Sequence, residues 1–444
     1  MAQNGTDIRQ LLDEAPMGRL QIAAVALCIM LNALDGFDVL AISFASPGIA
    51  AEWGIDRAAL GVVLSMELIG MAVGSVLLGG LADRIGRRPT ILLCLVIMAT
   101  GMLAATFSFS IVSLSVIRLV TGLGIGGMLA CTNAIVAELA NARTRSLAVA
   151  LMAAGYPIGA ILGGSAASML LMSGEWRDIF LLGGVVTAIF LPLTFLLLPE
   201  SIGFLLQRRP ANALDRINQL MGRMGHHALD ALPPSNAAAP KASFAALFSP
   251  GLARTTVLLT AAYFFHIMTF YFILKWLPKI VVDMGYAPSS AGGVLVWANV
   301  GGLLGALSLS ALSWRLDVRI LVIATLLLSM AMVTVFGQGQ ASLFGLAVVA
   351  AAAGYFTNAA VVGLYAIIAQ SFPTAVRAGG TGIVIGLGRG GAALGPILAG
   401  FLFTLDFKLP AVALTMASGS LIAACALALL VTGGRHSNSS KVYE

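Results

Sequence analysis

Two aspartates, Asp35 and Asp38, lie three positions apart within a long apolar stretch of the chain. On a helix this spacing places both carboxylates on one face. An ionised carboxylate inside a membrane helix is costly unless it faces a cavity, a partner or a proton, and two nearby carboxylates favour protonation of one of them. The pair therefore indicates a site that binds and releases a proton. The alternative is that either aspartate only fixes helix packing through a hydrogen bond.

The apolar stretch 111–139 contains two further charged residues. Arg118 is the expected counter-ion of the aspartates, because a guanidinium buried without a carboxylate would be costly. Glu138 is expected either to take part in proton coupling or to form an interfacial ion pair with Arg143 or Arg145. Proton coupling is thus assigned to Asp35, Asp38, Arg118 and Glu138.

Arg389 interrupts the glycine-rich run 386–391, where small neighbours leave room for a ligand. A planar guanidinium binds a carboxylate through two parallel hydrogen bonds, which an ammonium group does not match. Arg389 is therefore the first choice for binding a substrate carboxylate. The alternative is a structural ion pair with Asp35 or Asp38.

Residues 263–272 read YFFHIMTFYF, an aromatic cluster suited to stacking on a benzene ring. Aromatic residues in membrane helices more often pack or lie at the interface, so the cluster alone is a weak signal. His266 could titrate, bond a ring hydroxyl or bond a neighbouring helix. Gly36 is a poor helix former, and local unwinding there would let Phe37 reach the substrate. The predicted substrate-binding residues are Arg389, His266, Phe37, Phe265, Tyr271 and Trp297.

The segment 79–89 reads GGLADRIGRRP, a short basic turn between two apolar runs. In one interpretation its arginines only hold the turn on the cytoplasmic side, while Gly86 and Pro89 shape it. In the other the turn is a gate, in which Asp83 binds donors or a helix terminus that it must release during transport. The predicted gating residues are Asp83, Arg84, Arg87, Arg88 and Arg377.

The elements that position these residues are expected to be membrane helices. Of the 444 residues, 59% are hydrophobic and 10% charged, whereas soluble domains are about half apolar and a quarter charged. A hydrocarbon core of about 30 Å needs roughly 20 apolar residues per helical crossing. Runs of this length predict twelve helices at 20–50, 58–81, 89–108, 111–139, 146–172, 178–198, 254–282, 290–313, 317–336, 341–371, 378–403 and 409–432.

The charges between these runs predict the topology. With the N-terminus inside, about 18 of the 25 Lys and Arg fall on the cytoplasmic side, as the positive-inside rule requires. The net charge of +6 is therefore explained by topology, and no nucleic-acid partner is expected. Lys275 is expected to be an external interface anchor or an extra attraction for anions. The four cysteines lie in apolar runs without metal-ligand spacing, so neither a metal nor another cofactor is expected.

A polar interruption divides the chain into two groups of six runs. The predicted organisation is a cytoplasmic N-terminus (1–19), a six-helix bundle (20–198), a cytoplasmic linker (199–253) with an amphipathic helix near 214–224, a second bundle (254–432) and a cytoplasmic tail (433–444). A shift of 232 residues places Arg145 on Arg377 and Gly159 on Gly391, which indicates duplicated halves. Parallel repeats of this kind are typical of the major facilitator architecture.

The loop 79–89 resembles the GxxxDRxGRR motif of the major facilitator superfamily, and the sequence DGFD at 35–38 resembles the signature of the aromatic acid:proton symporters. Further agreement comes from the glycine run 122–127 and from the segment 372–396. The resemblance covers nearly the whole chain except the linker, and it implies that Arg118 and Glu138 matter for transport. The second-half loop 311–319 has lost the glycines of the motif, so the gating role passes to the first loop only.

The resemblance implies an all-α protein of twelve transmembrane helices that imports small aromatic carboxylates together with protons. Substrates of the hydroxybenzoate, benzoate, gentisate or phenylpropionate type are expected. The protein is expected to act as a monomer in the bacterial inner membrane, with both termini cytoplasmic. A drug exporter or sugar importer of the same fold is the alternative, and a membrane sensor or enzyme is disfavoured because neither a signalling domain nor a nucleophile–base pair is evident.

Overall fold

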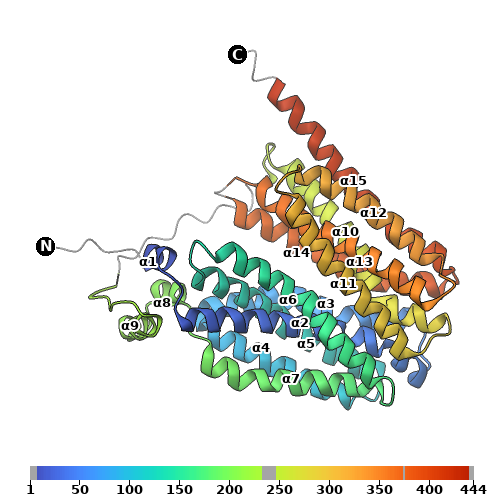
Figure 1. The fold of residues 1–444 in the computed structure, drawn as a ribbon, viewed down its shortest axis with the longest axis horizontal. Helices are drawn as coiled ribbons and strands as arrows, with labels where there is room; N and C mark the ends of the chain where they lie inside the picture. The colour runs from blue at the N-terminus through green and yellow to red at the C-terminus, as the bar shows by residue number, and fades with distance from the viewer. Residues whose placement is uncertain (1–7, 233–246, 374–375, 440–444) are drawn as a thin grey trace. The chain divides into compact units, whose positions relative to one another are not determined.

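All regular elements of the structure, a computed structural model that describes residues 8–232, 247–373 and 376–439, are helices (Figure 1). The predictions for the first seven residues, the linker residues 233–246 and the last five residues of the tail lie outside the described residues. The prediction of an all-α fold is confirmed.

Twelve helices of the described chain are long and apolar enough to cross a membrane. They begin and end within a few residues of the predicted runs, because apolar length is a local property of the sequence. These helices are α2 (Arg19–Trp53), α3 (Arg57–Ile85), α4 (Arg87–Thr106), α5 (Ile111–Leu139), α6 (Arg145–Leu170), α7 (Trp176–Leu197), α10 (Ala253–Asp283), α11 (Pro288–Leu312), α12 (Val318–Gly337), α13 (Leu343–Ser371), α14 (Arg377–Thr404) and α15 (Leu409–Ser439).

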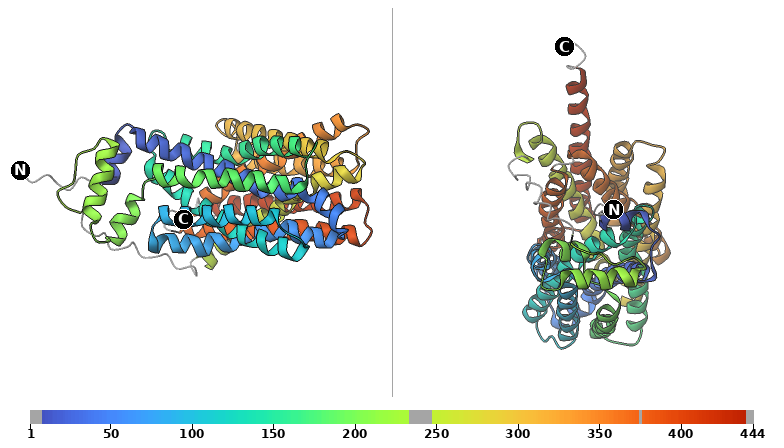
Figure 2. Two further views of the ribbon diagram at one scale, coloured as in Figure 1. Left: turned by 90° about the horizontal axis from the view of Figure 1, so that it is seen from below. Right: turned by 90° about the vertical axis from the view of Figure 1, so that its left-hand side faces the viewer.

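Three short helices complete the described chain: α1 (Ile8–Glu14), α8 (Ile202–Arg208) and α9 (Ala213–Met224). They lie together beside one end of the long helices of their unit (Figure 1, Figure 2). The amphipathic helix predicted near 214–224 is α9, which buries Ile217, Leu220 and Met221 and exposes its polar face. The sequence analysis did not predict α1 and α8.

The chain forms two compact units that do not follow the chain order. Unit 1 contains Met1–Val39, Gly70–Gly159 and Phe180–Ala239, and unit 2 contains Leu40–Ile69, Ala160–Ile179 and Pro240–Glu444. Unit 2 therefore combines all of α10 to α15 with parts of α2, α3, α6 and α7. The predicted bundle boundaries at 20–198 and 254–432 stay a prediction about the duplicated sequence.

Equivalent glycines make equivalent contacts within the two units. A methyl group on Gly159 of α6 would overlap the carbonyl oxygen of Ala33 on α2, within unit 1. A methyl group on Gly391 of α14 would likewise overlap the carbonyl oxygen of Phe264 on α10, within unit 2. The same close crossing thus recurs 232 residues later, which supports the predicted duplication.

The unwinding predicted at Gly36 is wrong, because α2 continues as a helix from Arg19 to Trp53. A side chain at Gly36 would overlap the main chain of Tyr156 on α6. The missing side chain therefore serves the close approach of two helix backbones, which is a common use of glycine in membrane helices.

Candidate functional site

The predicted proton site lies inside unit 1. Asp35 is 1% exposed, and Asp38 and Arg118 are 0% exposed. The Arg118 Nη2 atom donates a hydrogen bond to the main-chain oxygen of Asp38 over 2.8 Å. Its guanidinium carbon also lies 5.4 Å from the centre of the Phe180 ring. The structure therefore brings the Arg118 guanidinium to the main chain of the second aspartate, and its role as a counter-ion of the carboxylates remains a prediction.

Two residues of α7 also lie close to the Asp38 carboxylate, and the sequence analysis did not predict them. The Thr187 Oγ1 atom lies 3.5 Å from Asp38 Oδ2 and donates to the Gly183 carbonyl over 2.7 Å. A methyl group on Gly183 would overlap Met102 Cε and lie 3.2 Å from Asp38 Oδ1. A small residue thus leaves room for Met102 and the carboxylate where α7 passes them, and the Gly183–Gly184 pair was the available sequence signal.

This arrangement suits reversible protonation of Asp38. Arginine keeps its charge in proteins, so the Arg118 guanidinium remains a fixed positive charge beside the aspartate. A carboxylate that gains and loses a proton then changes the net charge of this buried cluster, while the surrounding helices keep water away. The cluster has the groups that proton coupling requires.

Glu138 does not lie with Asp35 and Asp38 but belongs to a separate group of charged and polar side chains. Its carboxylate pairs with Arg87 and accepts a hydrogen bond from Ser201. The alternative in which it pairs with Arg145 is wrong, because Arg145 pairs with Asp13 of α1. The end of α5 packs beside the start of α4, and this proximity of distant segments was not visible in the sequence.

The basic turn between α3 and α4 is held by a residue that the sequence analysis did not select, Glu200. Its Oε1 atom accepts main-chain hydrogen bonds from Arg87 over 2.9 Å and from Ser201 over 2.8 Å. A carboxylate at this position satisfies donors at the N-terminus of α4. Gly86 has a positive φ of 107°, and a side chain there would overlap Glu200.

Of the remaining gating candidates, three lie at exposed positions and Arg88 is partly buried. Asp83 and Arg84 are exposed, and the Asp83 main-chain oxygen accepts a hydrogen bond from Arg208 over 2.8 Å. Arg377 is exposed and donates to the Phe372 carbonyl over 3.2 Å. Arg88 donates to the Phe195 carbonyl at the end of α7. The gating role of these residues remains a prediction.

Arg389 lies in unit 2 next to Gly388, which packs against the Tyr263 ring. It is partly buried on α14, and its charge acts on the Tyr263 hydroxyl of α10. That hydroxyl is 2.9 Å from the Tyr365 hydroxyl of α13, and either group can donate. Within the residues that the structure describes, Arg389 forms no ion pair. A guanidinium near two hydroxyl groups provides the donors that a carboxylate and a ring hydroxyl would need.

The predicted aromatic residues do not form one group. Phe265 packs edge-to-face against Phe264 with ring centres 5.4 Å apart, and Tyr271 packs against Phe270 at 5.3 Å. Trp297 of α11 is 55% exposed. Phe37 is buried in unit 1, whereas Phe265, Tyr271 and Trp297 lie in unit 2. The sequence selected Phe265 and Tyr271, but the tyrosine that packs against the glycine before Arg389 is Tyr263.

His266 links helices of unit 2. It is 0% exposed, and its Nε2 atom lies 2.9 Å from the Thr357 carbonyl, to which it donates. Its Nδ1 atom lies 3.0 Å from the Ser420 hydroxyl, which is 3.1 Å from the Ser329 hydroxyl. Both ring nitrogens therefore have helix partners, and this geometry favours the alternative in which His266 bonds neighbouring helices.

Gly388 makes the space in which Tyr263 lies. A methyl group on Gly388 would overlap the Tyr263 ring, whereas one on Gly386 would meet nothing within 4 Å. We expect Gly388→Ala to lower the free energy of unfolding by about 1–3 kcal/mol, as overpacking does. The matched variant Gly386→Ala should change it by less than about 0.5 kcal/mol. Denaturant unfolding of the purified protein in detergent measures both, and equal values would contradict the proposed packing.

A buried ion pair in unit 2 was missed by the sequence analysis. Lys275 of α10 and Glu67 of α3 are both 0% exposed, and Lys275 Nζ lies 3.5 Å from Glu67 Oε2. The prediction that Lys275 is an external anchor or anion attractant is wrong. An unpaired charge would be costly at this depth, and a carboxylate from another helix offsets that cost.

Comparisons with known proteins agree with this architecture. The family model described as Major Facilitator Superfamily matches residues 26–316. The solved structure of the xylose transporter XylE from E. coli, in a partially occluded inward open conformation, superposes with a TM-score of 0.70 at 16% identity. The superposition covers 91% of this chain and 96% of the XylE chain.

Curated relatives match most of the chain. A gallate transporter of Pseudomonas putida is 31% identical, over 96% of this chain and 95% of that protein. A 3-(3-hydroxy-phenyl)propionate transporter of Escherichia coli is 32% identical, over 92% and 93%. The 4-hydroxybenzoate transporter PcaK of Acinetobacter baylyi is 30% identical, over 88% and 87%.

These matches and the twelve candidate spans define a multi-pass membrane transporter rather than an enzyme. The chain belongs to the Major Facilitator Superfamily, and the relationship to aromatic acid transporters expected from its sequence is confirmed.

Proposed function

We propose that the protein is a symporter that imports small aromatic carboxylates together with protons. The observation that carries the proposal is Arg389, a partly buried guanidinium without an ion-pair partner in the described chain, which follows the glycine that packs against Tyr263, whose hydroxyl bonds that of Tyr365. The named substrates of the curated relatives are gallate, 4-hydroxybenzoate and a hydroxyphenylpropionate, which all combine a carboxylate with a phenolic ring. Hydroxybenzoate, benzoate, gentisate and phenylpropionate types are the substrate classes that we propose.

In this proposal the substrate binds to residues of unit 2 and the proton binds to residues of unit 1. In unit 2, Arg389 binds the substrate carboxylate, and the two tyrosine hydroxyls bond either that carboxylate or a hydroxyl on the ring. In unit 1, Asp38 gains and loses the proton beside the fixed charge of Arg118, with Asp35 on the same helix face. Alternating access then couples the downhill movement of the proton to accumulation of the anion.

We further propose that the protein lies in the bacterial inner membrane as a monomer with both termini in the cytoplasm. The excess of Lys and Arg in alternate connections supports this orientation. The Glu138–Arg87 pair and the Glu200-capped turn would then lie at the cytoplasmic ends of α5 and α4. Opening and closing of this turn is the gating step that we assign to Asp83 and its neighbouring arginines.

Uptake of labelled 4-hydroxybenzoate into cells that express the protein tests the proposal, with unlabelled aromatic acids as competitors. Hydroxybenzoates, gentisate and phenylpropionates should compete, and an uncoupler should abolish accumulation. The matched amide 4-hydroxybenzamide should not compete, because it lacks the charge that Arg389 binds. Accumulation that resists the uncoupler would exclude proton coupling, and competition by sugars alone would return the function to another class of transporter.

A further inference from the structure

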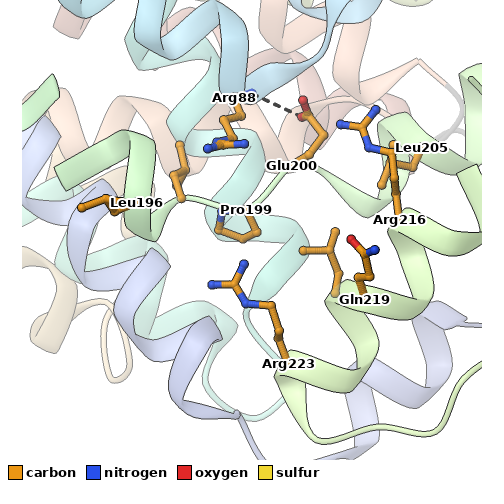
Figure 3. Close-up of a pocket in the computed structure, with 10 residues that line it drawn as sticks. Arg88, Leu196, Pro199, Glu200, Leu205, Arg216, Gln219 and Arg223 are labelled. Atoms are coloured by element: carbon orange, nitrogen blue, oxygen red, sulfur yellow. Dashed lines mark hydrogen bonds between the residues drawn. The ribbon is translucent and has the colours of Figure 1, made fainter. Parts of the chain in front are cut away.

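A second site lies in unit 1, away from the residues to which we assign substrate and proton binding, and it shares Arg88 and Glu200 with the turn to which we assign gating (Figure 3). It is a cavity of about 180 Å³ at the junction of the end of α7 with α4, α8 and α9. Its lining consists of the polar residues Arg88, Glu200, Arg216, Gln219 and Arg223 and the apolar residues Leu196, Leu198, Pro199, Leu205 and Leu220.

The cavity has an excess of positive charge. Figure 3 shows Arg88 and Arg223 directed toward Pro199 from opposite sides. Arg216 and Arg223 are two turns apart on α9, and within the described chain their side chains form no ion pair or hydrogen bond. The single carboxylate, Glu200, already accepts main-chain hydrogen bonds from Arg87, Arg88 and Ser201. The guanidinium groups of Arg216 and Arg223 can thus bind an anion from outside the protein, whereas Arg88 donates to the Phe195 carbonyl and adds its positive charge.

An apolar surface leads from the membrane to this cavity. The outer face of α7 exposes Val185, Ile189, Leu193 and Leu196, at 47%, 54%, 37% and 67%. These positions are three or four residues apart, so they form one stripe along a helix that is a candidate membrane span. A stripe of this kind on a membrane-spanning helix is suited to contact lipid chains, and it ends at Leu196, which lines the cavity. A ligand with both an anionic group and apolar chains fits this continuity.

We propose that this cavity binds the phosphate of an anionic membrane phospholipid, whose acyl chains lie along the α7 stripe. Basic pockets between membrane helices are suited to anionic headgroups, and each arginine near the surface contributes to the attraction. Inorganic phosphate shares the anionic chemistry but lacks the chains, so the stripe distinguishes the two sources. A lipid bound at this site would contact the segment that connects α7, α8 and α9, and it would not contact the aromatic substrate.

The test measures lipid binding to the purified full-length protein in detergent by native mass spectrometry. The probes are phosphatidylglycerol, phosphatidylcholine with the same acyl chains, and inorganic phosphate. The variant is Arg216→Gln/Arg223→Gln, and the matched control Arg315→Gln/Arg319→Gln removes two exposed arginines, one from the connection between α11 and α12 and one from the first turn of α12. Uptake of labelled 4-hydroxybenzoate by each variant establishes that it is folded.

We expect phosphatidylglycerol to bind the pocket variant about 30-fold more weakly than the unchanged protein, given roughly fivefold for each arginine. The control should lose less than about threefold, and phosphatidylcholine should bind weakly to all three proteins. An equal loss of phosphatidylglycerol affinity in the pocket variant and the control would overturn the proposal, because the lipid would then be attracted by the overall positive charge rather than by this cavity. Unchanged binding to the pocket variant would overturn it too. Displacement of the lipid by inorganic phosphate at equal concentration would assign the cavity to a free anion instead.

Discussion

Replacing Glu67 with methionine should lower the free energy of unfolding by about 3–5 kcal/mol, because it leaves the ammonium group of Lys275 buried without its carboxylate. Both side chains are 0% exposed, so water cannot replace the lost partner without rearrangement of α3 and α10. Denaturant unfolding of the purified protein in detergent measures the effect. The double variant Glu67→Met/Lys275→Met should recover most of the loss, since both charges are then replaced by apolar side chains of similar size.

Lys279 provides the control for this pair, one turn further along the same helix. It pairs with Asp283 of α10 at a partly exposed position. Lys279→Met should therefore cost less than about 1 kcal/mol. If the single and double variants at the buried pair were equally destabilised, the helix contact rather than the ion pair would carry the stability. An equal loss in Lys279→Met would also contradict the account.

Replacing Arg389 with alanine should weaken binding of 4-hydroxybenzoate by roughly 30-fold or more, since loss of one partner of a desolvated charge pair costs about 2 kcal/mol or more. Arg389→Lys should recover only part of the affinity, because an ammonium group keeps the charge but not the planar fork. Equilibrium binding of the labelled acid to purified protein measures both variants.

The neutral 4-hydroxybenzamide separates charge recognition from general damage in this experiment. Its weak binding should be nearly the same in the unchanged protein and in Arg389→Ala, because neither protein gains from a carboxylate that is absent. Lys408 is a matched control, since it is an exposed cation just beyond the end of α14. If Lys408→Ala reduced acid binding as strongly as Arg389→Ala, general attraction of anions would replace the specific site.

The helices could be predicted from the sequence because membrane crossing depends on local apolar length. The amphipathic α9 was also predictable, since its buried residues recur at helical spacing. Charges inside apolar runs, such as Asp38 and Arg118, could be selected as candidates because a charge in such a run needs a partner or a function, and their burial agrees with this. Placing a charge in an apolar helix costs free energy, and this cost is evident from the sequence even when the partner of the charge is unknown.

The partners themselves could not be predicted, because they depend on which helices pack together. Arg87 and Glu138 are 51 residues apart, and nothing in either segment identifies the other. The same holds for Glu67 and Lys275, which pair although they lie on α3 and α10, and Glu67 was not selected although it is a charge inside an apolar run. Gly36 shows the converse error, since a poor helix former was taken as a break although it serves close packing.

The most direct test of the account is proton movement driven by substrate in sealed proteoliposomes. A pH-sensitive dye inside the vesicles reports protons when 4-hydroxybenzoate is added outside, and vesicles without protein correct for passive entry of the acid. We expect the unchanged protein to acidify the interior as the substrate enters. Asp38→Asn should abolish this proton flux while still exchanging labelled for unlabelled substrate, because the amide cannot release a proton. Substrate entry without acidification in the unchanged protein, or full acidification in Asp38→Asn, would contradict it.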